Sequence, residues 1–174
     1  MNTSHIWRHS LVILIILCFT GCASTGGLHT KTPVTVKLAN YRTILLYVSS
    51  QVPESSGETI QLGSIITDRL HNKGLFEKVL VASTSPGCRA DLELNAEIVE
   101  LKRVSPGARI CLGALTGRAG VVVDVALTDM NTGTMIGSFR AEGKSSGGTV
   151  FAGTTIQAIE CAAEQIVEFL ERNM

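Results

Sequence analysis

The residue with the clearest chemical assignment is Cys22, whose thiol lies at the end of a short targeting motif. Arg8 supplies a positive charge, and residues 11–17 (LVILIIL) form an uninterrupted apolar run. The small residues Thr20 and Gly21 then directly precede the cysteine. A positive start, an apolar stem and small residues before the cut are the parts of a secretory signal peptide. The motif predicts cleavage before Cys22, which then begins the mature chain.

The run that ends in Thr20-Gly21-Cys22 resembles the lipobox of bacterial lipoproteins. The resemblance implies a diacylglycerol on the Cys22 sulfur and a further acyl chain on the new amino group. Stable attachment to a membrane needs two or more such chains. Ala23, and not an aspartate, follows the cysteine, a pattern that favours the outer membrane in enterobacteria-like sorting. We therefore expect a lipid anchor at the periplasmic face of the outer membrane.

Two alternatives exist for this segment. One is a transmembrane anchor, but residues 11–19 supply nine residues, and about 20 are needed to cross the hydrocarbon core. The other is ordinary secretion, with Cys22 as a free or disulfide-bonded thiol. We favour lipidation because Gly21-Cys22 falls at the position that a lipoprotein signal requires.

The other groups that could do chemistry are poorly placed for it. Glu93 and Glu97 share one face of a predicted strand, where a spacing of four residues separates them by about 13 Å, too far for an acid–base pair. Gly143-Lys144-Ser145 ends like a phosphate-binding loop, but Ser138 stands where G-x-x-x-x-G-K-[ST] requires the first glycine. We expect no catalytic residues, no nucleotide, no cofactor and no enzyme activity.

Histidines and cysteines give no metal-binding pattern. His29 and His71 have no candidate nucleophile close in sequence, and the spacing of Cys88, Cys111 and Cys161 matches no zinc motif. In an oxidising compartment one pair of these three cysteines can form a disulfide, and the sequence leaves open whether any pair does. We expect no metal site.

The mature chain has an almost neutral charge. Loss of Arg8 leaves 14 Lys and Arg against 15 Asp and Glu, so composition offers no basic field for nucleic acid or for anionic lipid headgroups. The expected partners are therefore the membrane, through the lipid on Cys22, and either another envelope protein or further copies of the chain.

Three parts follow along the chain. Residues 1–21 are the predicted lipoprotein signal peptide. Residues 22–37 are rich in Ser, Thr and Gly, show no apolar periodicity and predict a flexible tether that lifts the domain off the membrane. Residues 38–174 have the length and apolar content of one periplasmic domain.

Periodicity within 38–174 predicts an α+β fold with a mixed five-stranded sheet and two helices on one face. The elements form a strand–helix–strand unit, a three-stranded antiparallel meander and a closing helix. Signals for the first helix are Ser55-x-x-Glu58 as a capping box, a stripe from Leu62 to Leu70 and Gly74 after its last turn. The strand at 91–98 alternates cleanly, with a bulge expected at Ile98-Val99. The predicted strands are 42–48, 76–82, 91–98, 119–128 and one through Met135, Phe139 and Ala141.

The closing helix has Thr154-x-x-Gln157 as its cap and an apolar stripe from Ile156 to Leu170. Cys161 points away from that stripe, among glutamates. We therefore predict that Cys161 is exposed unless the tether or a partner covers it.

Short motifs place the chain near a known family. Residues 90–148 contain Ala90-Asp91, Arg109-x-x-x-Gly113-x-x-x-Gly117, Asp129-x-x-Thr132-Gly133 and Ser145-Ser146-Gly147-Gly148. These features resemble the uncharacterised bacterial lipoproteins known as domain of unknown function 4410. Leu115 stands where that family's loop carries another glycine. The resemblance implies an anticodon-binding-like periplasmic α/β fold, as in the amino-terminal domain of TolB, and implies no activity.

The Gly-rich loop from Gly107 to Gly120 is a candidate interaction surface, because small residues let another backbone approach closely. Its candidate contact residues are Arg109, Gly113, Gly117, Arg118 and Gly120. The alternative is a hairpin connection folded against its own sheet. The leading functional hypothesis is a non-enzymatic binding or assembly module, and the second is a subunit of a homo-oligomeric envelope export or assembly complex.

Overall fold

The computed structural model describes residues 25–84, 87–104, 118–146 and 154–174. Within these ranges the chain forms one sheet and two long helices, with a short 3-10 helix at Leu38–Asn40. The elements are β1 (Thr25–Thr32), β2 (Thr43–Ser50), α2 (Ser56–Lys73), β3 (Lys78–Val81), β4 (Leu92–Lys102), β5 (Gly120–Asp129), β6 (Thr134–Lys144) and α4 (Thr155–Arg172).

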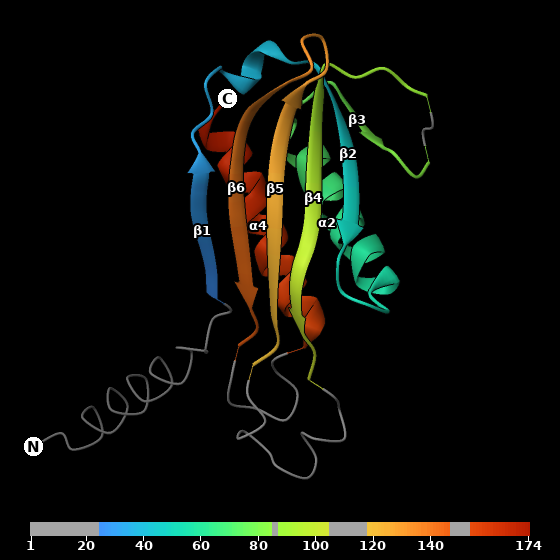
Figure 1. Ribbon diagram of the computed structural model, residues 1–174, viewed down its shortest axis with the longest axis vertical. Coiled ribbons are helices and arrows are strands. Elements are labelled where there is room, and N and C mark those ends of the chain that lie inside the picture. Colours follow the sequence, from blue (N-terminus) through green and yellow to red (C-terminus); the bar gives the residue numbers. More distant parts are fainter. Residues whose placement is uncertain (1–24, 85–86, 105–117, 147–153) are drawn as a thin grey trace, which may run out of the picture.

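The sheet has six strands in the order β1-β6-β5-β4-β2-β3 (Figure 1). β2 runs parallel to both β3 and β4, because α2 returns the chain to the end of the sheet where β2 began. β4, β5, β6 and β1 pair antiparallel. The α+β class, the mixed sheet and the antiparallel meander are confirmed, whereas the prediction of five strands is wrong by one.

The additional strand is β1, which lies in the segment 22–37 predicted to be a flexible tether. It pairs with β6 from Thr25 opposite Lys144 to Thr32 opposite Ser138. Of its side chains only Leu28 is an apolar group packed against the core. The strand forms because its backbone groups hydrogen-bond to the edge of β6. Backbone pairing does not require alternating apolar side chains, so the sequence of this segment shows no such alternation. The tether prediction is therefore wrong for residues 25–32.

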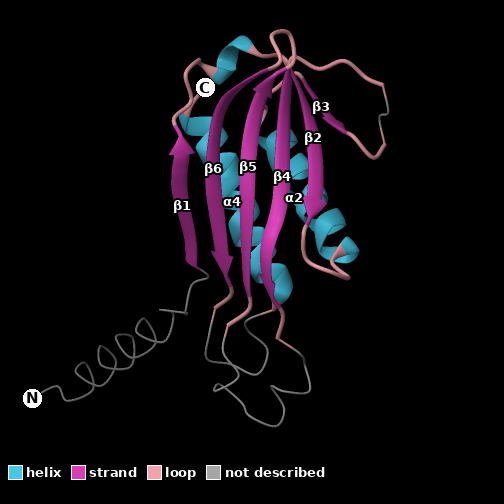
Figure 2. Cartoon of the chain, viewed as in Figure 1, coloured by secondary structure: helices cyan, strands magenta, loops and turns pink. Residues whose placement is uncertain are grey.

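Both helices cover one face of the sheet, and the opposite face carries no helix in the described part of the chain (Figure 2). The core lies between these two layers and is closed at its centre by Phe139 of β6 and Phe169 of α4, whose rings stack with centroids 3.9 Å apart. The predicted core positions of β4 are confirmed, since Leu92, Leu94 and the next two alternate residues are buried. The expected bulge is also confirmed, because the register of β4 against β5 shifts just after Ile98.

Helix α4 crosses β6 at a glycine. A Cβ atom at Gly143 would overlap the carbonyl oxygen of Ala158 and lie 2.7 Å from the amide nitrogen of Ala162. The backbones of helix and strand therefore meet without an intervening side chain, and the small residues of α4 are what permit this approach.

Cys161 is buried, with 5% of its surface exposed, which is the exception that the prediction allowed if residues 22–37 covered this side of the helix. The reason is β1. Gln165, one turn further along the same side of α4, lies against Gly26 of that strand. The segment taken for a free tether thus packs beside the helix face that carries Cys161.

Two helix-end predictions are confirmed and one is wrong. The Thr154 side chain accepts a hydrogen bond from Gln157 N, and Gly74 ends α2 in the left-handed conformation at φ 60°. Ser55 does not cap α2, because its hydroxyl donates to Val52 O at 2.6 Å. None of the helices in the described ranges is long and apolar enough to cross a membrane.

Candidate functional site

An apolar groove lies beside the β3 edge of the sheet. It has a volume of about 510 Å³ and lies where α2 leaves the ends of β2 and β3 uncovered. A Cβ atom at Gly63 of α2 would lie 3.5 Å from a methyl carbon of Val48, which is an ordinary packing distance. Ile60, on the rim, is 73% exposed. The residues that line this groove include Leu46, Val48, Ile60, Gly63, Thr67 and Val81.

The threonine hydroxyls in the groove are already satisfied by the chain itself. The Thr67 hydroxyl donates to Gly63 O at 2.8 Å, and the Thr59 hydroxyl donates to Ser55 O at 2.8 Å. Asp68 is the charged side chain in the lining. The groove therefore suits an apolar occupant better than a charged small molecule.

One wall of the groove is an open strand edge. β3 pairs with β2 only as far as Leu46 opposite Val81, and Ala82 N donates to Leu46 O at 2.9 Å. β2 continues to Ser50 beside β4. On the side of β2 that faces away from β4, Val48 has no backbone hydrogen bond among the described residues. An extended segment of another chain could pair at this edge and place apolar side chains in the groove.

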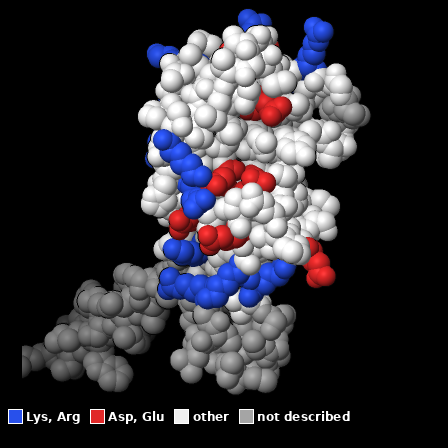
Figure 3. Space-filling view, in the orientation of Figure 1, with Lys and Arg blue, Asp and Glu red and all other residues white. Residues whose placement is uncertain are grey.

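The open face of the sheet carries a charged cluster (Figure 3). Arg140 binds Asp124 through two hydrogen bonds of 2.7 and 2.9 Å, and Lys31 of β1 approaches the same carboxylate at 2.8 Å. The Arg140 hydrogen bonds, reinforced by Lys31, lower the pKa of Asp124 to about 2. This cluster links three strands and leaves no free charge for catalysis at its centre. Beside it the Asn95 side-chain oxygen is buried and accepts no hydrogen bond among the described residues.

Three of the family motifs have structural roles. The Asp91 carboxylate accepts hydrogen bonds from Arg42 N, Thr43 N and the Thr43 hydroxyl, which joins the starts of β2 and β4. Asp129 accepts from Asn131 N and Thr132 N and closes the turn between β5 and β6.

At the other end of these strands, Ser145 is fully buried. Its hydroxyl accepts from Ala119 N at 3.0 Å, and its own amide donates to Ala119 O at 3.0 Å. These contacts hold the ends of β5 and β6 together, so this part of the motif is architectural.

The structure separates the predicted site residues. Cys22, Arg109, Gly113 and Gly117 lie outside the described residues. Arg118 is exposed just before β5, and Gly120 is the first residue of that strand and pairs with Lys144. Gly120 is therefore part of the sheet.

Glu93 and Glu97 lie on the open face, as predicted for a solvated strand face. Among the described residues no group of three or more His, Cys, Asp or Glu side chains could hold a metal ion.

The groove was not predicted from the sequence, although Ile60 gave a signal for it. Ile60 lies on the side of α2 opposite the stripe of Leu62 and Ile66, and an isolated apolar residue on the polar side of an amphipathic helix can mark a contact surface. The open β2 edge gave no signal, because it depends on where β3 stops.

Comparisons with known proteins agree with this architecture. PelC of Paraburkholderia phytofirmans, solved as a dodecamer, is similar in structure with a TM-score of 0.53 and 16% identity, over 82% of this chain and 95% of that one. A point variant of the same PelC, also a dodecamer, gives a TM-score of 0.55 with the same identity and coverage. A Xanthomonas campestris protein of the DUF330 family has a TM-score of 0.43 and 9% identity, over 82% of this chain and 83% of that one. At 16% identity the likeness to PelC shows the fold alone.

No protein of curated function matches the chain. The family described as domain of unknown function DUF4410 matches residues 55–149, which is more than half of the 174 residues. The match spans the Asp91, Asp129 and Ser145 motifs whose contacts are described above. The chain belongs to the DUF4410 family.

Proposed function

We propose that this protein is a lipid-anchored envelope protein that acts by assembling with further copies of itself and not by catalysis. The lipobox ending in Cys22 supports the anchor, and Ala23 supports the periplasmic face of the outer membrane as its site. The observation that carries the assembly is the apolar groove at the β3 edge, in a fold shared with a dodecamer.

The geometry suits a head-to-tail contact. A ring requires two different surfaces on opposite sides of each subunit. The groove and the open part of β2 lie at one edge of the sheet, and β1 forms the other edge. In the proposed ring the β1 edge of one copy lies against the groove of the next, so that the subunits stand side by side with their strands aligned.

A second candidate is a monomeric module that binds another envelope protein. The open edge of β2 next to Val48 favours it, because an extended segment of any partner could pair there. The two candidates differ in what occupies the groove.

The experiment is the native mass of the protein extracted from envelopes in mild detergent. Ile60→Glu would place a charge in the groove, and Met135→Glu is the matched control, because Met135 is 57% exposed on β6. We expect a defined oligomer in the wild type and the control, and monomers in Ile60→Glu. A monomer in all three samples with a co-purifying protein lost only in Ile60→Glu would establish the second candidate instead.

The Gly-rich loop is tested in the same assay. A Gly113→Leu/Gly117→Leu variant that dissociates would assign the loop to the subunit contact, and a variant that keeps the wild-type mass would leave the contact to the groove.

A further inference from the structure

The distance between the lipid and the folded domain is short. β1 begins at Thr25, three residues after Cys22. Three residues can span at most about 11 Å when fully extended. Thr25 pairs with Lys144, the last residue of β6, so the lipid holds this end of the sheet close to the membrane surface. A flexible tether of 16 residues would have left the domain free to turn.

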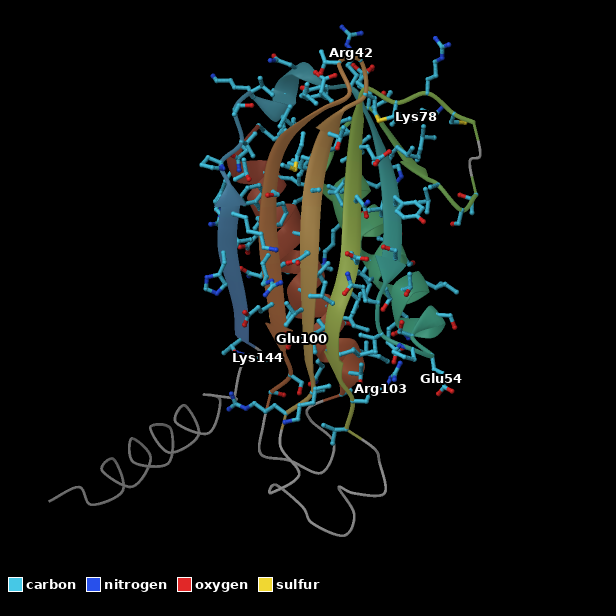
Figure 4. The ribbon with its side chains drawn as sticks, in the orientation of Figure 1. Arg42, Glu54, Lys78, Glu100, Arg103 and Lys144 are labelled. Carbon is cyan, nitrogen blue, oxygen red and sulfur yellow. The ribbon has the colours of Figure 1, made fainter. Side chains whose placement is uncertain are left out.

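The same end of the sheet is where basic side chains gather. Lys102 ends β4, Lys144 ends β6, and both pair with Gly120 of the strand between them. Arg103 follows Lys102, and Arg118 precedes β5. Figure 3 shows a band of Lys and Arg across this end of the open face, and Figure 4 places Lys144 and Arg103 there, far from Arg42 and Lys78.

The acidic residues of β4 and β6 at this end lie further from the anchor, whereas Glu54 lies beside Arg103 at the same end (Figure 4). Glu100 and Glu142 stand one exposed position back along β4 and β6, each opposite Val122. Two residues of strand separate the two rows by about 7 Å, which is close to the Debye length of about 8 Å at physiological salt. A surface that touches the last row of these strands therefore meets Lys102 and Lys144 before Glu100 and Glu142.

Some of these basic residues are already paired with acidic groups of the chain, and others are not. Arg103 donates to Glu58 at 2.6 Å and to Glu54 O at 2.7 Å, and Lys144 lies 3.5 Å from Glu142. Lys102 and Arg118 are exposed and have no ion pair within the described ranges. The near-neutral total charge of the chain does not reveal this arrangement of the strand ends.

We propose that the end of the sheet formed by Lys102, Arg118 and Lys144 rests on anionic phospholipid headgroups around the anchor, with the strands standing away from the membrane. This inference rests on the proposed lipid at Cys22. Upright strands also leave both edges of the sheet facing sideways, where neighbouring copies would meet. Glu100 and Glu142 oppose an orientation in which the open face of the sheet lies on the membrane, because that orientation would bring both glutamates to the anionic surface.

The test measures the height of the domain above a bilayer. The lipidated protein, with Cys111 replaced by serine, is reconstituted in vesicles of phosphatidylcholine with or without phosphatidylglycerol. A fluorophore is attached to the exposed Cys88, which lies four residues before Leu92, the first residue of β4. Lys102 is at the other end of this strand, so the fluorophore reports the height of the far end of the domain by energy transfer to acceptor lipids in the headgroup layer. The mass of the Cys22 peptide from the same sample establishes the lipid separately.

We expect low transfer with phosphatidylglycerol and higher transfer without it, because an unbound domain tilts toward the surface. Each basic residue near an anionic surface shifts such an equilibrium by about fivefold. Lys102→Gln/Lys144→Gln should therefore raise the transfer in phosphatidylglycerol vesicles. Arg42→Gln/Lys78→Gln, which removes two positive charges from the opposite end, should not (Figure 4).

Transfer that is the same in both vesicles, or that changes equally in the two double variants, would overturn the inference while the lipid on Cys22 stands. A Cys22 peptide without lipid would overturn the anchor and this inference together.

Discussion

Gly143 of β6 and Ala158 of α4 are in direct backbone contact, which fixes where the closing helix crosses the sheet. A side chain at position 143 would occupy the space of the Ala158 carbonyl oxygen. Backbone cannot yield as a flexible side chain can, so any larger residue must push α4 away from β6. The stacked pair of Phe139 and Phe169 lies in the same helix–strand interface and would separate with it.

We therefore expect Gly143→Ala to lower the free energy of unfolding by about 2–4 kcal/mol, measured by urea denaturation. Gly120→Ala is the matched control, because its Cβ would approach no atom nearer than 3.8 Å. The control should change stability by less than about 1 kcal/mol. Equal losses in the two variants would contradict the role of the close helix contact.

Asp91 provides the second test of the fold. Its carboxylate accepts three hydrogen bonds, two of them from Thr43, and the Thr43 hydroxyl accepts in turn from Asp91 N at 2.9 Å. The hydrogen bonds from Thr43 lower the pKa of Asp91. We expect Asp91→Ala to lower the free energy of unfolding by about 2 kcal/mol, because it leaves these donors without their acceptor.

The control for Asp91 is Asp68→Ala, at an exposed carboxylate of α2. It should change stability by less than about 0.5 kcal/mol. In a double-mutant cycle Asp91→Ala and Thr43→Val should be strongly non-additive, since each removes the partner of the other. Additive losses would mean that the two side chains do not act together.

The sequence predicts β4 well and β1 not at all, for one physical reason. β4 is paired on both sides and buries alternate residues under the helices, so its sequence alternates between apolar and polar residues. β1 is an edge strand that buries little beyond Leu28 and pairs with β6 more than 100 residues away. Its stability comes from backbone pairing, which cannot be predicted from the types of its residues.

The candidate sites follow the same division. The lipobox is a local pattern and can be read from the sequence alone. The groove and the basic end are formed by residues from separate strands, and Lys102, Gly120 and Lys144 become neighbours only through the register of β4, β5 and β6. The total charge of a chain does not show where its charges lie. Helix periodicity gave the side of α4 that carries Cys161, but not that β1 packs beside that side.

The burial of Cys161 predicts a difference in thiol reactivity. In the native, reduced protein Cys88 should react with a maleimide within minutes and Cys161 only on unfolding, as followed by mass spectrometry. Leu28→Asp should expose Cys161, because Leu28 packs β1 against the core. His29→Asp, on the open face of the same strand, should leave Cys161 protected. A fast reaction at Cys161 in the wild type would mean that β1 does not cover α4.

The Asp124 cluster predicts how stability depends on pH. The pKa of Asp124 is about 2 in the folded protein and 3.8 for the free group, so the folded state favours the ionised carboxylate. Its contribution is complete above about pH 4 and is lost as the pH falls through 2. Since the Asp124 side chain is 26% exposed, screening by solvent limits this contribution to about 1–2 kcal/mol.

Asp124→Asn should therefore be less stable than the wild type by about 1–2 kcal/mol at pH 7, and the difference should largely vanish at pH 2. Urea denaturation at the two pH values measures it. Lys31→Gln/Arg140→Gln removes both cationic partners and should weaken the pH dependence in the same way, because the pKa of Asp124 then returns toward its ordinary value. A stability difference between Asp124→Asn and the wild type that stays constant from pH 7 to pH 2 would show that the cluster stabilises the sheet by packing and not by charge.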